Sequence, residues 1–115
     1  MRHVVEQHDA KHAVALSEPV LLILMSLAEQ PRHGYALLKD IESLSGGRVR
    51  LSTGTLYGAL RRLLQDRWIE RFAQADISRD KQAYRLTSLG RRLLQGEIRR
   101  MMQLTRAARL RLRES

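Results

Sequence analysis

Residues 52–64 carry side chains that suit contact with a large anionic partner. Ser52 is a favoured N-cap, and leucines recur after it at helical spacing. The predicted buried stripe of this helix is Leu56, Leu60 and Leu63. The opposite stripe combines Gly54 and Gly58 with Arg61. Because an exposed glycine costs a helix roughly 1 kcal/mol against alanine, the two glycines indicate that a partner approaches the backbone closely.

Arg61 and Tyr57 supply the hydrogen-bonding groups beside these glycines. The guanidinium of Arg61 matches the O6/N7 edge of guanine and equally suits a phosphate, so the sequence leaves both roles open. The Tyr57 hydroxyl is predicted to bond a phosphate, and the alternative is that the ring packs on the protein's own sheet. The segment therefore predicts contact with duplex DNA.

The charge of the chain is distributed unevenly. Of its 115 residues, 21 are Lys or Arg and 12 are Asp or Glu, which gives a net charge of +9. Residues 17–47 hold two basic and four acidic side chains, whereas residues 48–115 hold 17 basic and six acidic ones. The basic half begins where the DNA-contact segment begins, which favours nucleic acid as the partner over an arginine-rich composition alone.

Several functional classes are excluded by the sequence. The chain has no cysteine, and its longest apolar run, Val20–Met25, is far shorter than the ~20 residues that span a bilayer. We therefore expect a cytoplasmic protein without a membrane partner. His8 and His12 lie four residues apart but lack a third ligand, so we predict no metal site. No catalytic or phosphate-loop motif occurs, and we expect neither an enzyme nor a cofactor.

Patterning predicts four helices and a hairpin. Residues 18–30 are apolar almost all round, with Pro19 in the first turn, which predicts a buried helix. A second helix is predicted over residues 34–45, ended by Gly46-Gly47, and the third begins at Ser52 and ends near Asp66. The predicted inward stripe of the second helix is Tyr35, Leu38, Ile41 and Leu44.

Alternation of polar and apolar residues predicts three strands. They are expected at residues 48–51, 68–72 and 83–86, and the last two should form a hairpin around the polar loop 74–81. The predicted order of elements is helix, helix, strand, helix, strand, strand and helix. This order defines a winged helix-turn-helix. The fold class is therefore α+β and mostly helical.

The last helix is expected to begin after the N-cap Thr87 and to continue to about Arg113. Apolar and small residues recur along it in steps of four and three, which defines a heptad seam. This predicted dimerisation seam is Leu94, Ile98, Met101, Thr105, Ala108 and Leu112. Because so small a core cannot cover a helix this long, its far half is expected to pack on the same helix of a second copy.

The chain resembles the PadR family of transcriptional regulators, specifically short members with one C-terminal helix. The resemblance covers roughly residues 17–100. It depends on the segments 33–39 (His-Gly-Tyr-Ala-Leu-Leu-Lys), 51–57 (Leu-Ser-Thr-Gly-Thr-Leu-Tyr), 59–63 (Ala-Leu-Arg-Arg-Leu) and 84–87 (Tyr-Arg-Leu-Thr), and on Gly90. It implies a homodimeric DNA-binding repressor that leaves its operator when a small molecule binds.

The resemblance also implies site residues and an effector. The DNA-contacting positions would be Ser52, Thr53, Gly54, Thr55, Tyr57 and Arg61, with Arg79 and Lys81 in the wing. Asp76 and Asp80 nearly cancel the charge of that wing, and no aromatic residue follows Tyr84 to stack a planar drug. Met101 and Met102 suit either helix packing or a pocket for a small apolar or phenolic effector.

Three parts are expected along the chain. Residues 1–16 form an arm or an extra helix, residues 17–86 the DNA-binding domain, and residues 87–115 the dimerisation helix. The predicted function is sequence-specific binding of a double-stranded operator by a dimeric repressor. The alternative is a winged-helix interaction module whose basic face binds protein or RNA.

Overall fold

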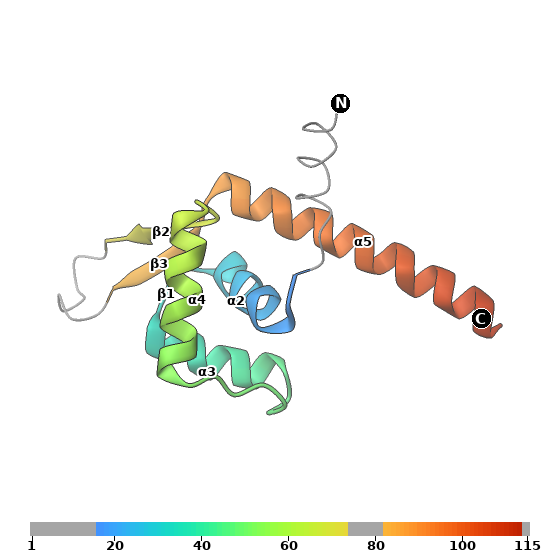
Figure 1. Ribbon diagram of the computed structural model, residues 1–115, viewed down its shortest axis with the longest axis horizontal. Helices are drawn as coiled ribbons and strands as arrows, with labels where there is room; N and C mark the ends of the chain where they lie inside the picture. Colours follow the sequence, from blue (N-terminus) through green and yellow to red (C-terminus); the bar gives the residue numbers. More distant parts are fainter. Residues whose placement is uncertain (1–15, 74–81, 114–115) are drawn as a thin grey trace.

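The computed structural model describes residues 16–73 and 82–113. Its elements follow in the order α2 (Glu18–Glu29), β1 (Arg32–His33), α3 (Gly34–Leu44), α4 (Thr53–Gln65), β2 (Ile69–Phe72), β3 (Ala83–Leu86) and α5 (Ser88–Leu112). The strands form one antiparallel sheet in the order β1-β3-β2. The α+β, mostly helical winged helix-turn-helix with a long C-terminal helix is therefore confirmed (Figure 1).

The helix ends follow from the predicted capping residues. Ser52 accepts a hydrogen bond from the Thr55 N–H at 3.1 Å, and Thr87 accepts one from the Gly90 N–H at 3.0 Å. Each serves as the N-cap of its helix, α4 and α5 respectively. The chain leaves α3 through two glycines with positive φ, Gly46 and Gly47. The local signals in the sequence thus fix where α3 ends and where α4 and α5 begin.

Helix α2 is the centre of the hydrophobic core. It packs against α3, α5 and β3. Its fully buried apolar residues are Leu22, Ile23, Leu24 and Leu27. A helix with neighbours on several sides needs apolar residues around most of its circumference, which explains the nearly continuous apolar run that predicted its burial.

The predicted inward stripe of α3 was wrong for two of its four residues. Tyr35 is 65% exposed and Leu44 is 45% exposed, whereas Leu37 and Ile41 are completely buried. Leu37 and Ile41 lie one turn apart and form the face that packs on α2. The buried face is therefore rotated around the helix axis relative to the predicted one, and Tyr35 is directed to solvent.

The strand predicted at residues 48–51 was also wrong. This segment is a loop in which Arg48 pairs with Glu18 and the Val49 N–H donates to the Ser45 hydroxyl oxygen at 2.9 Å. The third strand is instead β1, whose Arg32 lies opposite Tyr84 of β3. A strand needs a neighbouring strand, and β3 already has β1 on one side and β2 on the other.

The joint between the sheet and α5 is tight. Arg67 has a left-handed φ of 65° and turns the chain from α4 into β2. The Trp68 carbonyl then lies so close to Gly90 that a Cβ on Gly90 would stand 2.9 Å from the carbonyl carbon and nearer still to its oxygen. The same carbonyl oxygen accepts the Thr87 N–H at 3.1 Å. Only glycine fits here, because the opposing atoms are backbone.

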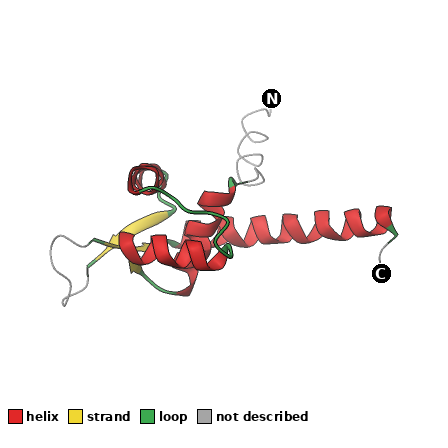
Figure 2. Cartoon of the chain, turned by 90° about the horizontal axis from the view of Figure 1, so that it is seen from below, coloured by secondary structure: helices red, strands yellow, loops and turns green. Residues whose placement is uncertain are grey.

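Helix α5 is attached to the core by its first half only. Leu93, Leu94 and Glu97 are buried, and the helix then continues away from the other elements (Figures 1 and 2). The Glu97 carboxylate accepts two hydrogen bonds from Arg100, at 2.8 and 2.7 Å, and one from the Leu16 N–H at 3.2 Å. The Arg100 guanidinium holds the pKa of Glu97 below its usual range.

Replacement of Glu97 by glutamine is expected to lower the free energy of unfolding by about 1–2 kcal/mol at pH 7. Since the folded-state pKa of Glu97 is lowered, its contribution is present above the unfolded value of about 4.3 and is lost as the pH falls through the folded-state pKa. Urea unfolding of parent and variant between pH 3 and pH 7 measures this. Glu70→Gln, which breaks an exposed pair with Arg85, should change stability by less than about 0.5 kcal/mol. Equal losses for both variants would contradict the assignment.

Candidate nucleic-acid interface

Helix α4 has an outer surface that its own chain leaves uncovered. Leu56, Leu60 and Leu63 point into the core, as predicted, and the opposite side of the helix faces solvent. We call this side the α4 outer surface; it consists of Ser52, Thr53, Gly54, Thr55, Gly58 and Arg61. Nothing lies within 4 Å of a Cβ built on Gly54, and only the Arg61 guanidinium, at 3.9 Å, is near one built on Gly58.

Polar groups frame the two glycines of the α4 outer surface. The Ser52 hydroxyl donates to the Thr55 hydroxyl oxygen at 2.9 Å, so both side chains are held at the start of the helix. Arg61 is exposed, and no carboxylate in residues 16–73 or 82–113 pairs with it. Bare backbone, hydroxyls and an available guanidinium suit a ligand with phosphates and hydrogen-bonding base edges.

Tyr57 lies at the edge of this surface and is 39% exposed. Its hydroxyl is directed toward the first residue of α3, because a Cβ on Gly34 would stand 2.7 Å from Tyr57 Cζ and closer to the oxygen. This contact could not be predicted from the sequence, because residues 34 and 57 belong to different helices. Arg79 and Lys81, the predicted wing contacts, lie outside the described residues.

Two side chains that were not predicted to belong to the site, Tyr35 and Lys39, lie in the first half of α3. Tyr35 is largely exposed, and the Lys39 ammonium stands 5.4 Å from the centre of its ring. This places an aromatic ring and a cation on the helix that precedes α4. The signal that could have found them is the i, i+4 spacing of Leu37 and Ile41, which puts Tyr35 on the opposite side of α3.

The predicted dimerisation seam divides into two parts. Leu94 is only 5% exposed and belongs to the protomer's own core. Its position near the attached end of α5 explains this. Beyond it, Ile98 is exposed and Met101 partly so. The other seam residues, all exposed, are Thr105, Ala108 and Leu112.

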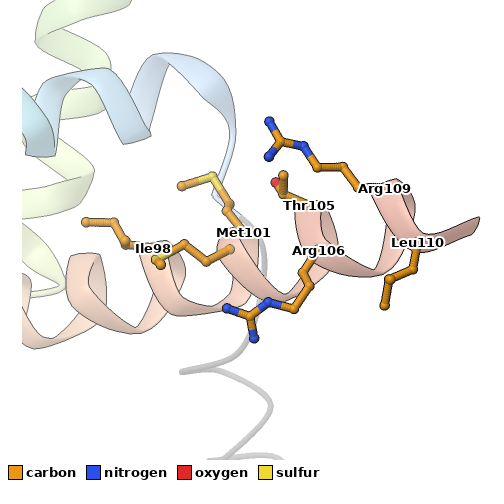
Figure 3. A pocket seen from close by; sticks show the side chains of 7 residues that line it. Ile98, Met101, Thr105, Arg106, Arg109 and Leu110 are labelled. Carbon is orange, nitrogen blue, oxygen red and sulfur yellow. The ribbon is translucent and has the colours of Figure 1, made fainter. Parts of the chain in front are cut away.

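A groove of about 490 Å³ runs along this far half of α5 (Figure 3). Its lining combines apolar side chains with two arginines. The lining residues are Ile98, Met101, Met102, Thr105, Arg106, Arg109 and Leu110. It includes both methionines that the sequence suggested for an apolar pocket.

In the part of the chain that the structure describes, no helix is both long and apolar enough to cross a bilayer. Likewise, residues 16–73 and 82–113 hold no group of three metal-ligating side chains. His8 and His12 fall outside those ranges.

Comparison with known proteins agrees with the fold. Residues 23–96 match the model of the transcriptional regulator PadR-like family. A 37.1 kDa protein of transposon Tn4556 from Streptomyces fradiae is 39% identical over 85 residues, which make up 74% of this chain and 23% of that protein. The chain thus spans about a quarter of the length of that relative.

Solved structures share the architecture. A PadR family transcription regulator from Clostridium difficile superimposes with a TM-score of 0.69 at 21% identity, covering 84% of this chain and 99% of that one. A transcriptional regulator from Clostridium thermocellum gives 0.66 at 21% identity, covering 78% and 85%. At this identity the likeness supports the fold.

The fold and the α4 outer surface define a winged helix-turn-helix protein of the DNA-binding class. The family match is decisive for the rest: the chain belongs to the PadR-like family of transcriptional regulators, and it is not an enzyme.

Proposed function

We propose that this protein is a dimeric, sequence-specific repressor that binds an operator in double-stranded DNA. The observation that carries the proposal is the α4 outer surface, where Gly54 and Gly58 leave the backbone bare beside Arg61. A helix in the major groove must bring its backbone close to the base edges, and this surface permits that. Ser52, Thr53 and Thr55 supply hydroxyls for phosphates, and Arg61 contacts a base or a phosphate.

Replacement of Arg61 by alanine is expected to weaken operator binding by about 10- to 100-fold, because it removes a bidentate contact worth about 1–3 kcal/mol. The operator is a duplex selected by the parent protein from a randomised pool, and affinities are measured by mobility shift at fixed salt. The exposed Arg92 provides a control, since Arg92→Ala removes the same charge from a different helix, α5. Equal affinity of Arg61→Ala and parent would contradict the proposal.

Competition with bulk DNA separates this function from the alternative one. A specific operator should outcompete bulk DNA by about a thousandfold or more, and its affinity should fall steeply with salt as counterions are released. A protein whose selected duplex gains no such advantage would instead be an interaction module that binds protein or RNA through its basic face.

We place the proposed dimer contact on the α5 groove. Five large apolar side chains beyond residue 97 are exposed on α5, and a second copy would remove them from water. They are Ile98, Met102, Leu104, Leu110 and Leu112.

The same groove is the proposed effector site. Its volume of about 490 Å³ suits a small apolar or phenolic effector, and Arg106 or Arg109 would bind the anionic form of such a molecule. Binding of the effector would release the operator.

Replacement of Ile98 by glutamate is expected to weaken dimerisation by about tenfold or more, since the charge would be buried without a partner. Sedimentation velocity over a range of protein concentrations measures this. Gln103→Glu adds the same charge at an exposed position of α5 that does not line the groove. It should leave the dimer unchanged, and a parent protein that stays monomeric at every concentration would contradict the dimer.

A further inference from the structure

Three segments that are distant in the sequence meet at the side chain of Tyr57. Tyr57 belongs to α4, Gly34 is the first residue of α3, and Tyr84 lies on the central strand β3. These residues also come from three of the four segments that carry the family resemblance, namely 33–39, 51–57 and 84–87. The convergence indicates that the three segments share one structural role, the packing around the Tyr57 side chain.

The contact between Tyr57 and Gly34 leaves no room for a side chain at position 34. A Cβ there would stand 2.7 Å from Cζ and 3.4 Å from Cε1 of Tyr57, and closer still to the hydroxyl oxygen. Gly34 is itself buried, and its φ is not in the left-handed region. The requirement for glycine is therefore one of space, because the tip of the tyrosine occupies the place of a side chain.

Tyr84 lies near Tyr57 on the side of the sheet. Tyr84 is 5% exposed, and its pKa is raised by burial and, next, by the proximity of Tyr57. Arg32, two residues before Gly34, lies opposite Tyr84 in the sheet. The Tyr57 side chain therefore packs on the first residue of α3 close to the place where α3 leaves the sheet.

We propose that Tyr57 is a positioning residue for DNA binding, which sets the distance between α3 and α4 and so presents the α4 outer surface to the operator. The inference rests on the proposed function. Gly54 lies one turn before Tyr57 and Arg61 one turn after it on the same helix. Any shift of α4 at Tyr57 therefore moves both. The hydroxyl is directed to Gly34, and the ring rather than a phosphate bond carries the effect.

Four variants test this assignment by mobility shift with the selected operator duplex. Tyr57→Phe keeps the ring and removes the hydroxyl, whereas Tyr57→Leu shortens the side chain. Gly34→Ala introduces the methyl group for which there is no space. The double variant Gly34→Ala/Tyr57→Leu places that methyl group where the shortened side chain has left room. Foldedness of each variant is checked by urea unfolding. Gly58→Ala, which adds a methyl group to α4 with only the flexible Arg61 side chain nearby, is the reference for stability alone, because Gly58 itself belongs to the α4 outer surface.

Positioning by the ring predicts a specific order of affinities. Tyr57→Phe should bind within about threefold of the parent, and each of Gly34→Ala and Tyr57→Leu should bind about tenfold or more weakly. The double variant should bind more tightly than Tyr57→Leu alone, because the two changes compensate. If Tyr57→Phe loses as much affinity as Tyr57→Leu, the hydroxyl is a direct DNA contact and the inference is wrong. A double variant that binds no better than Tyr57→Leu also contradicts the inference, because the two changes then do not compensate.

Urea unfolding distinguishes failure of this inference from failure of the proposed function. The midpoint of the double variant should lie above that of Gly34→Ala, whether or not DNA is bound. A parent protein that selects no duplex, together with this rise in midpoint, would refute the proposed function and the role of Tyr57 in DNA binding while leaving the packing contact intact. A double variant no more stable than Gly34→Ala would refute the contact itself.

Discussion

Replacement of Gly90 by alanine is expected to lower the free energy of unfolding by about 3 kcal/mol, which is at the upper end for overpacking. The new methyl group would stand 2.9 Å from the carbonyl carbon of Trp68 and closer to its oxygen. This carbonyl cannot move aside cheaply, because it is backbone and accepts a hydrogen bond from the Thr87 N–H at 3.1 Å. Urea unfolding followed by circular dichroism measures the loss.

Gly58→Ala is the matched control for the Gly90 variant. A methyl group at position 58 meets only the Arg61 guanidinium, at 3.9 Å. It should raise stability by up to about 1 kcal/mol, as expected for alanine in a helix interior. An unchanged midpoint for Gly90→Ala would mean that α5 can move away from β2 without cost, and the joint would not be tight.

Replacement of Gly54 by glutamate should change DNA affinity and fold stability in opposite directions. Gly54 is exposed in the first turn of α4, where a carboxylate interacts favourably with the helix dipole and a longer side chain has open space. The free energy of unfolding should therefore stay the same or rise by about 0.5–1 kcal/mol. Operator affinity should fall about 100-fold or more, because the side chain blocks close approach and its charge repels phosphate.

Ser88→Glu is the control for the Gly54 variant. Ser88 is the exposed first residue of α5, so the same charge is placed at the N-terminus of a different helix, outside the α4 outer surface. It should leave operator affinity within about threefold of the parent, since the added charge is screened and no side chain of the α4 outer surface changes. Mobility shift and thermal denaturation of both variants give the two readouts. Undiminished operator binding by Gly54→Glu would show that α4 does not enter the groove.

The parts of the fold that depend on local signals could be predicted from the sequence. The caps Ser52 and Thr87 and the glycine pair 46–47 each act within one turn of a helix, so the nearby residues suffice to locate the ends. The hairpin of β2 and β3 was also expected, because two alternating segments joined by a short loop tend to pair.

Contacts between distant segments could not be obtained in this way. The residues of β1 form a strand only because β3 offers them an edge, and the alternation at residues 48–51 indicated a strand where none forms. In the candidate site, helical periodicity identified the open side of α4. It could not show that the Tyr57 hydroxyl is directed to Gly34, since that depends on how α3 and α4 pack.

The continuity of α5 has a mechanical consequence. Its 25 residues form one uninterrupted helix of about 37 Å at 1.5 Å per residue, and Gly90 holds its base against the sheet. In the proposed dimer this rod acts as a lever arm, because a tilt of each rod by about 10° displaces one of its ends relative to the other by about 6 Å. That displacement is comparable to one or two base-pair steps along the duplex. A small change at the α5 groove would therefore move the two DNA-binding domains out of register with their half-sites.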